Sequence, residues 1–501
     1  MKKIFFFILS ILLPILMQSQ SLKYVNNLIN KNSKEQPKFE SNDLAYHLNY
    51  HENLSYPIQC TSFNRNENLL NDDTLFNKKY SIWKPALEVV GFNALTWAYD
   101  RYMLNADYSI ISINTWKHNI KTGWEWDKDR FGINFIFHPY SGAMCFNTSR
   151  TSGYNYFESV PFAIGGSLMW EYFGENTLPS YNDIINTPVN GALIGEILYR
   201  ISSNILDDRK RGAERVFREI FAGIIDPVRG INRIIQGKTF RITSKEVYQK
   251  EPLSIMLAGG VQKINNGTNF GTGEASGLAS LDIVYGDAFE KRNRKPFDYF
   301  ETKIVLDNGD GATKRILDNF SAYGILFGKN VQSGKMEMLL GGFQNYDYNN
   351  NNTFELGNIT FSGGILSKLP VGKKSFLYTN LHLGIVPFGG YSTKLGPDTS
   401  EFRDYNFGGG MGGKFKSTLD ICNLVNVGFS ADYYWMRTYS GTPGNNLIGI
   451  IKPSILFRVY KNLNLGFEYF LYANDRNPGK HPDFDMKNSE QRIILLYDFK
   501  N

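Results

Sequence analysis

His138 is the residue of this sequence best placed to do chemistry. It is one of six histidines, it follows the apolar run 131–137, and a Pro-Tyr-Ser-Gly turn comes directly after it. Two carboxylates further along the chain, Glu171 and Glu175, are four residues apart and would share one face of a helix end. A histidine paired with a carboxylate can activate a hydroxyl for nucleophilic attack. The candidate hydroxyls in this region are Ser141, Ser180 and Ser202.

The same histidine could instead hold a metal ion together with Glu171, Glu175 or Glu196. No motif of fixed spacing supports either chemistry, because the sequence contains no HExxH, no GxSxG and no paired cysteines. A histidine that satisfies a buried hydrogen bond is the simpler interpretation. The sequence therefore predicts no metal and no cofactor, and it leaves open whether the chain is an enzyme.

If the chain has an active or binding centre, we expect it where polar clusters stand at the ends of predicted elements, since such ends converge in a small bundle. The catalytic candidates are His138, Glu171, Glu175, Asn182 and Asp183. In the otherwise apolar stretch Val189–Ile205 the only charged residues are Glu196 and Arg200, which should therefore point into a polar interior.

A wider set of polar residues is expected to bind a ligand or to form a structural polar core. Its members are Glu196, Arg200, Ser202, Glu214, Arg215, Arg218, Glu219, Arg229, Asn232 and Arg233. Three pairs in this set, Glu196/Arg200, Glu214/Arg218 and Arg215/Glu219, are four residues apart and are most simply salt bridges within helices.

These residues lie in a region, 80–238, whose apolar spacing predicts a helical domain. Helices are expected at 83–104, 161–173, 180–206, 212–222 and 227–237. None of them contains the roughly 18 uncharged apolar residues of a spanning helix. Pro139 after His138 is expected to stop a helix or strand, and Gly191 with Gly195 to mark a close contact between helices.

Residues 252–499 instead alternate between apolar and small or polar side chains, which is the period of a β-strand. In Val425–Trp435 the odd positions are apolar, whereas the even positions carry Asn, Gly, Ser, Asp and Tyr; Leu463–Leu471 has a similar pattern. Aromatic residues gather towards strand ends, and the opposite face is rich in Gly and Asn. This pattern is typical of a transmembrane barrel with a polar lumen.

The predicted fold is mainly β: an antiparallel transmembrane barrel of about 12 strands, preceded by a helical plug or periplasmic cap. The strands are expected near 252–262, 277–286, 297–306, 315–328, 334–344, 353–366, 374–387, 404–417, 423–437, 447–459, 462–474 and 489–499. Ten or fourteen strands remain open. Glycines on predicted inward faces would leave room for part of the helical domain; they are Gly324, Gly384, Gly408, Gly410 and Gly412.

The N-terminus predicts secretion. Two lysines precede an apolar run that is too short to span a membrane, so 1–20 is expected to be a signal peptide cleaved near Gln20, and 21–79 a flexible periplasmic leader. Without residues 1–20 the net charge falls from +6 to +4, because two lysines leave with them, which gives no reason to expect a nucleic-acid partner. Three scattered cysteines allow at most one disulfide.

Residues 83–237 resemble a bacterial family known as domain of unknown function 3943. The segments that carry the resemblance, in order, are Phe131–Tyr140, Ser152–Tyr154, Glu158–Phe162, Gly165–Glu171, Pro179–Asp183, Gly195–Glu196, Tyr199–Ser202, Glu214–Arg215, Arg218–Glu219, Pro227–Gly230 and Asn232–Arg233. The resemblance implies an envelope protein of Gram-negative bacteria, with a helical domain ahead of a variable C-terminal region. It implies no established activity and supplies no catalytic residues.

Two classes of function follow from these patterns. The favoured one is a non-enzymatic channel, transport or assembly component of the outer membrane; the alternative is a lipid- or glycolipid-modifying hydrolase with a His/carboxylate site. The expected partners are outer-membrane lipids and, because the last strand alternates and ends on the aromatic Phe499, the barrel-assembly machinery. The sequence does not predict an oligomeric state.

Overall fold

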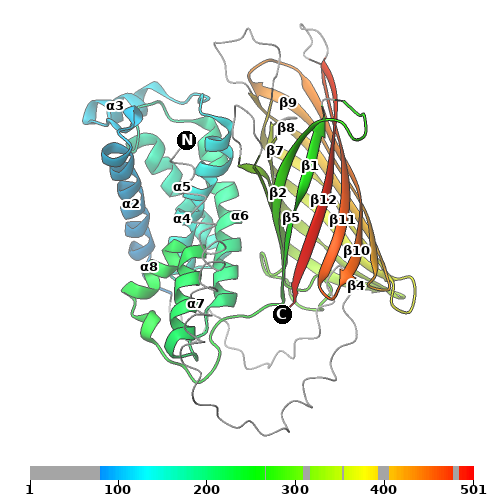
Figure 1. Cartoon of the computed structure of the whole chain (residues 1–501). Coiled ribbons are helices and arrows are strands. Elements are labelled where there is room, and N and C mark those ends of the chain that lie inside the picture. The colour runs from blue at the N-terminus through cyan, green and yellow to red at the C-terminus, as the bar shows by residue number, and fades with distance from the viewer. Residues whose placement is uncertain are drawn as a thin grey trace, which may run out of the picture.

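The computed structural model describes residues 79–265, 267–308, 316–351, 355–392, 405–477 and 484–500. Within these ranges the chain forms a helical domain and a closed β-barrel that lie side by side (Figure 1). The expected signal peptide and nearly all of the expected leader fall outside the described residues.

The barrel consists of twelve described strands, each antiparallel to its two neighbours, and it closes by pairing β1 with β12. The strands are β1 (Leu253–Asn265), β2 (Glu274–Tyr285), β3 (Phe300–Asp307), β4 (Leu317–Ser333), β5 (Met336–Asn350), β6 (Glu355–Pro370), β7 (Phe376–Ser392), β8 (Tyr405–Ile421), β9 (Val425–Ser440), β10 (Asn445–Tyr460), β11 (Leu463–Asn477) and β12 (Phe484–Lys500). The predicted strand number is confirmed, and most strands are longer than predicted because their ends carry polar residues.

The alternation along each strand separates an apolar outer wall from a polar lumen. In β9, Val427 and Phe429 are exposed on the outside, whereas Asn426 and Tyr434 are buried on the inside. A two-sheet core would bury the apolar set instead. The exposed apolar wall therefore confirms the transmembrane prediction.

The room left by inward-facing glycines is taken by other lumen side chains. A Cβ atom at Gly412 would lie 2.7 Å from Cδ1 of Tyr434, and one at Gly389 would lie 3.3 Å from Sδ of Met436. Gly324 does not face the lumen as predicted. It pairs with Gln344 on the outer wall, where the ring of Phe297 covers it.

The helical domain contains more helices than predicted. It comprises α2 (Trp83–Ala98), the π-helical turn η1 (Tyr99–Met103), the 3-10 turn η2 (Asp107–Ser109), α3 (Ile113–Thr122), the π-helical turn η3 (Ile133–Phe137), α4 (His138–Arg150), α5 (Tyr156–Phe173), α6 (Tyr181–Ile205), α7 (Gly212–Ile225), α8 (Pro227–Ile235) and the 3-10 turn η4 (Lys238–Phe240). None of the helices in the described ranges is both long enough and apolar enough to cross a membrane.

Two helix boundaries correct the sequence predictions. Pro139 does not stop an element; the chain is helical on both sides of it, as the π-helical turn η3 before it and as α4 after it. Helix α5 starts at Tyr156 rather than at Pro161, because Asn155 accepts from the N–H of Glu158 and Glu158 accepts from that of Asn155. This capping box outweighs a proline six positions into the helix.

The helical domain packs against the outer wall of the barrel, so the prediction of a lumen plug is wrong. The hydroxyl of Tyr346, an outward-facing residue of β5, donates to the carbonyl of Phe135, and the hydroxyl of Tyr156 donates to Oε1 of Gln344 at 2.7 Å. The ring of Phe135 lies against two outer-wall glycines, Gly357 and Gly390. Aromatic side chains from both units form one buried core.

Candidate functional site

His138 opens α4, between the π-helical turn η3 and Pro139. Its Nε2 atom lies 3.6 Å from Oδ2 of Asp129 and 3.7 Å from Oδ1 of Asp183. Asp129 belongs to the segment between α3 and η3, and Asp183 to the first turn of α6. The imidazole therefore lies between two carboxylates that come from different parts of the chain.

Hydrogen bonds at the start of α6 hold the end of α5 beside this histidine. The N–H of Asp183 donates to Oγ of Ser180 at 3.4 Å, which caps α6. The N–H of Ser180 in turn donates to Oε2 of Glu171 at 2.7 Å. The carbonyl of Glu175 accepts from Nδ2 of Asn119 at 3.1 Å, which fixes the chain just beyond α5.

A third aspartate, Asp127, is held in place by two amides. Nδ2 of Asn134 donates to its Oδ1 atom and Nδ2 of Asn182 to its Oδ2 atom, each at 2.9 Å. The barrel also contributes, because the hydroxyl of Tyr405, the first residue of β8, accepts from Nδ2 of Asn134 at 2.7 Å and donates to the carbonyl of Asp129 at 2.6 Å. The loop end of the barrel thus helps to position the site.

The site contains more carboxylates than basic side chains, and several of the carboxylates are buried. Burial raises the pKa of Glu175 to about 7 and also raises the pKa of Asp183. Burial alone would lower the pKa of His138, but the negative charges of Asp183, Glu171 and Asp127 hold that pKa well above its usual value. The carboxylates around His138 therefore favour a positive charge at this point of the structure.

The structure brings the catalytic candidates into one neighbourhood: His138, Glu171, Glu175, Asn182 and Asp183. Asp127, Asp129 and Asn134 also lie at the site, although they were not among the predicted residues. The signal that could have found them is the Asp-x-Asp spacing just ahead of the apolar run before His138.

Glu196 and Arg200 belong to a separate ion-pair cluster. The carboxylate of Glu196 accepts from Nε of Arg150 at 2.6 Å and from Nε of Arg200 at 2.8 Å. Nη2 of Arg200 also donates to the carbonyl of Pro296, in the connection between β2 and β3. Both charges point into the polar interior, as predicted, and Glu196 is paired there with two arginines rather than placed at the histidine.

The remaining polar candidates form ion pairs around α7 and α8. Arg218 pairs with Glu214 on the surface, and Arg215 pairs with Glu219 and with Asp208, which confirms the expected helix salt bridges. The other members are held by neighbouring elements: Ser202 donates to the carbonyl of Tyr199, Asn232 to Glu88 and Thr151, and Arg233 pairs with Asp208 and Glu219.

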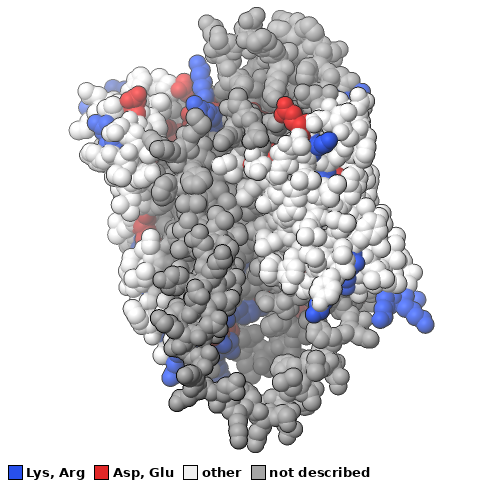
Figure 2. Space-filling view, in the orientation of Figure 1, with Lys and Arg blue, Asp and Glu red and all other residues white. Residues whose placement is uncertain are grey.

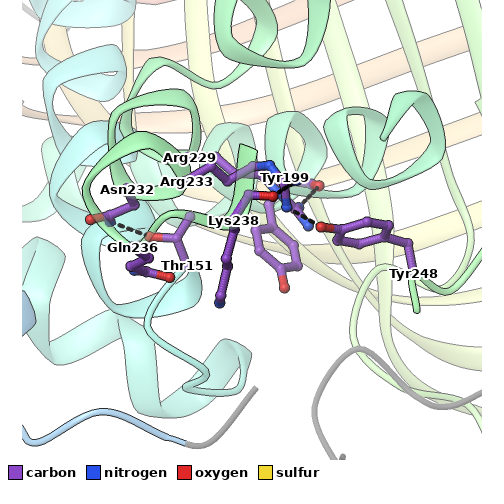
Figure 3. A pocket seen from close by; sticks show the side chains of 8 residues that line it. All are labelled: Thr151, Tyr199, Arg229, Asn232, Arg233, Gln236, Lys238 and Tyr248. Carbon is purple, nitrogen blue, oxygen red and sulfur yellow. Dashed lines mark hydrogen bonds between the residues drawn. The ribbon is translucent and has the colours of Figure 1, made fainter. Parts of the chain in front are cut away.

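A small cavity beside these pairs is lined by Thr151, Tyr199, Arg229, Asn232, Arg233, Gln236, Lys238 and Tyr248 (Figure 3). Nη1 of Arg229 donates to the carbonyl of Tyr199 at 2.9 Å, and Arg233 donates to the hydroxyl of Tyr248. The cavity volume is about 20 Å³, room for one water molecule. We therefore assign this arginine cluster a structural role.

A closed antiparallel barrel with an apolar outer wall is the architecture of outer-membrane proteins. The chain is accordingly an outer-membrane β-barrel protein that carries a helical domain. Residues 123–228 of that domain match the family model described as a domain of unknown function (DUF3943), which confirms the resemblance seen in the sequence. No curated protein is similar to the chain at a significant level.

Solved outer-membrane proteins align with about half of the chain. OmpT of Vibrio cholerae is 9% identical, with a TM-score of 0.23, over 49% of this chain and 96% of its own. The channel DcaP of Acinetobacter baumannii is 7% identical, with a TM-score of 0.23, over 49% and 96%. The NanC porin is 8% identical, with a TM-score of 0.28, over 48% and 98%.

Proposed function

We propose that the chain is a channel or transport component of the outer membrane whose lumen is closed by ion pairs in this conformation. The observation that carries the proposal is the pair between Lys416 of β8 and Glu301 of β3, whose Nζ and Oε2 atoms are 3.2 Å apart. In the ring of twelve strands, β3 and β8 are five positions apart, so this pair extends almost across the lumen.

Two further contacts cross the lumen between strands that are four positions apart. The hydroxyl of Tyr434 in β9 donates to Oδ2 of Asp347 in β5 at 2.8 Å. Nη2 of Arg492 in β12 pairs with Oδ2 of Asp318 in β4 at 3.1 Å. A polar wall bridged in this way suits a pathway for polar solutes that opens only when the bridges separate.

The bridges differ in how easily they can open. The side chains of Lys416 and Glu301 are 58% and 24% exposed, so water can replace their interaction at a cost of about 0–1 kcal/mol. Those of Arg492 and Asp318 are 4% and 3% exposed, and breaking such a buried pair costs roughly 3–5 kcal/mol. We therefore assign the gating step to Lys416 and Glu301.

Conductance of the purified full chain in a planar bilayer tests this proposal. The double variant Lys416→Ala with Glu301→Ala removes the bridge without leaving an unpaired charge. We expect it to open several-fold more often than the wild type. The control is Lys461→Ala, in the turn between β10 and β11, which removes one lysine outside the lumen and should leave opening unchanged. If neither the wild type nor the double variant conducts ions, the channel proposal is wrong.

We infer that outer-membrane lipids contact the outer surface of the helical domain. Its exposed side chains include many large apolar residues: Trp83, Leu87, Val90, Leu95, Tyr99, Tyr102, Met103, Phe157, Ile164, Val216, Phe217, Ile220, Ile231, Ile234 and Ile235. Its interior, by contrast, holds buried charges such as Glu196 and Arg150. Figure 2 shows largely uncharged surface on both units between charged side chains near the two ends of the barrel.

The direction of the chain in the membrane follows from its connections. Both barrel termini and several short turns, such as 334–335 and 461–462, lie at one end, which in outer-membrane barrels is the periplasmic end. We infer that the arginine cluster near α7 and α8 faces the periplasm. The histidine site, which contacts Tyr405 at the opposite end, would then lie near the cell exterior.

The alternative function, a lipid-modifying hydrolase, is favoured by the His/carboxylate cluster next to a lipid-facing surface. A hydrolase needs a nucleophile, and two of the three candidate serines already form hydrogen bonds within the protein. Ser180 caps α6, whereas Ser202 donates to the carbonyl of Tyr199 and accepts from Arg229. A change in the lipid profile of a strain with the substitution His138→Ala, at normal barrel levels, would support the hydrolase over the channel.

A further inference from the structure

The strongest unassigned feature of the molecule is the set of ligand-type atoms around His138. Oxygen atoms of Asp127 and Asp129 and a ring nitrogen of His138 all lie within 4.8 Å of one another. A fourth group, Oδ1 of Asp183, lies 3.7 Å from Nε2 of the histidine. Asp127, Asp129 and His138 thus offer ligand-type atoms to one another's neighbourhood, and Asp183 lies beside the histidine.

The separations at this point fit a shared cation better than a direct hydrogen bond. Nε2 of His138 is 3.6 Å from Asp129 and 3.7 Å from Asp183, whereas N–H···O bonds have lengths of about 2.7–3.2 Å. Two atoms that each lie about 2.1 Å from a tetrahedrally coordinated ion are about 3.4 Å apart. The observed spacing is close to that value.

Two of these atoms are buried without a hydrogen-bond partner. Among the described residues, neither Nε2 of His138 nor Oδ1 of Asp183 has a hydrogen-bond partner. The side chain of Asp183 is only 3% exposed, so bulk water cannot solvate its oxygen. Buried polar atoms in native proteins are nearly always satisfied, so the unpaired oxygen of Asp183 is available to a bound cation.

The surrounding residues have the features of an outer coordination shell. Asn134 and Asn182 each donate to a different oxygen of Asp127, and the hydroxyl of Tyr405 fixes the backbone of Asp129. Such bonds orient ligating carboxylates. The Asp129 side chain is 51% exposed, which leaves a path for an ion to enter.

We propose that Asp127, Asp129, His138 and Asp183 form a binding site for a divalent transition-metal ion, of the class of Zn²⁺ or Mn²⁺. The imidazole favours these ions over Ca²⁺, which takes oxygen ligands, and the carboxylates supply more than enough negative charge to neutralise the ion. This site lies in the helical domain and does not depend on whether the barrel conducts.

Metal titration of the full chain tests the proposal. The purified protein is treated with a chelator and titrated calorimetrically with ZnCl₂, MnCl₂ and CaCl₂ in separate experiments. We expect one ion of Zn²⁺ or Mn²⁺ per chain, and at least tenfold weaker binding in each of two variants, Asp183→Asn and His138→Gln. Glu214→Gln, which removes one carboxylate from the surface of α7, is the matched control and should bind as the wild type does.

Thermal unfolding with and without the metal provides a second measurement that separates binding from folding. The wild type should gain thermal stability when ZnCl₂ or MnCl₂ is added, whereas a folded Asp183→Asn variant should not. Absence of saturable binding in the wild type overturns the proposal. So does binding that survives unchanged in both site variants.

Discussion

At the scale of single residues, Asp226 shows how burial and hydrogen bonding oppose each other in the helical domain. Its Oδ1 atom accepts from the N–H of Arg229 at 3.0 Å and so caps α8. A helix N-terminus favours a negative charge. Asp226 is nevertheless fully buried, and burial raises its pKa from the ordinary 3.8 to about 6. Desolvation therefore outweighs the cap and the helix dipole here.

This shift predicts a pH dependence of stability. Because the folded chain holds the Asp226 proton more tightly than the unfolded chain, the contribution of this group is present below pH 3.8 and is lost as pH rises through about 6. Asp226→Asn keeps the cap oxygen and has no charge. Its free energy of unfolding, relative to the wild type, should therefore increase between about pH 4 and pH 6, as measured by urea unfolding across that range.

In the control variant, the difference in unfolding free energy from the wild type should change with pH in the opposite direction. A hydrogen bond from Arg218 holds the pKa of Glu214 below its usual value. Glu214→Gln should therefore lose stability relative to the wild type as the pH rises. If the difference in unfolding free energy between Asp226→Asn and the wild type does not change with pH, the raised pKa of Asp226 is wrong.

At the scale of elements, the contact between α4 and α6 determines the shape of the helical domain. A Cβ atom at Gly142 would lie 2.0 Å from the carbonyl oxygen of Thr187, and one at Gly191 would lie 2.6 Å from the carbonyl carbon of Gly142. A Cβ at Gly195 would lie 2.7 Å from the ring of Phe146. The two helices therefore approach backbone to backbone, as the pair Gly191 and Gly195 predicted.

Substitution at this contact should destabilise the helical domain. Gly191→Ala inserts a methyl group against backbone that cannot move aside, so we expect the free energy of unfolding to fall by about 1–3 kcal/mol. Gly165→Ala is the matched control: it lies in α5, and a Cβ there has nothing within 4 Å. It should stabilise the helix by about 0.5–1 kcal/mol. Denaturant unfolding, followed by the helical circular dichroism signal, measures the unfolding free energy of both variants. Equal changes in the two variants would rule out the close contact.

At the scale of the whole molecule, a helical domain with many large apolar side chains on its surface and several buried ion pairs lies along the outer wall of a barrel. The shared core includes Phe135 from the helical domain and Phe388 and Phe407 from the wall. The proposed contact with lipids accounts for this surface, because apolar side chains can then face hydrocarbon while ion pairs form inside.

Spin labels can test this arrangement in liposomes. After replacement of Cys60 and Cys422 by serine, a label at Leu95→Cys on α2 should collide with oxygen, which concentrates in hydrocarbon, more often than with a water-soluble nickel chelate. A label at Lys117→Cys, on the exposed polar face of α3, should show the reverse preference. Equal access of the chelate to both positions would place the helical domain in water.

The sequence alone was enough to predict the barrel and a strand number of about twelve, because alternation between lipid and lumen is a local property of each strand. Helices α6, α7 and α8 were also predictable from their caps and spacing. By contrast, Pro139 was misinterpreted as a stop, since the turn η3 before it carries no sequence signal that we recognised.

The tertiary structure alone decided where the helical domain lies and which polar residues meet. Tyr405 reaches Asn134 across 271 residues, and Lys416 reaches Glu301 across 115. Such contacts depend on how the barrel closes and on which of its faces is covered. Periodicity identifies the apolar face of a strand, but lipid and a packed helix are equally good neighbours for that face, so only the folded chain shows which of them is present.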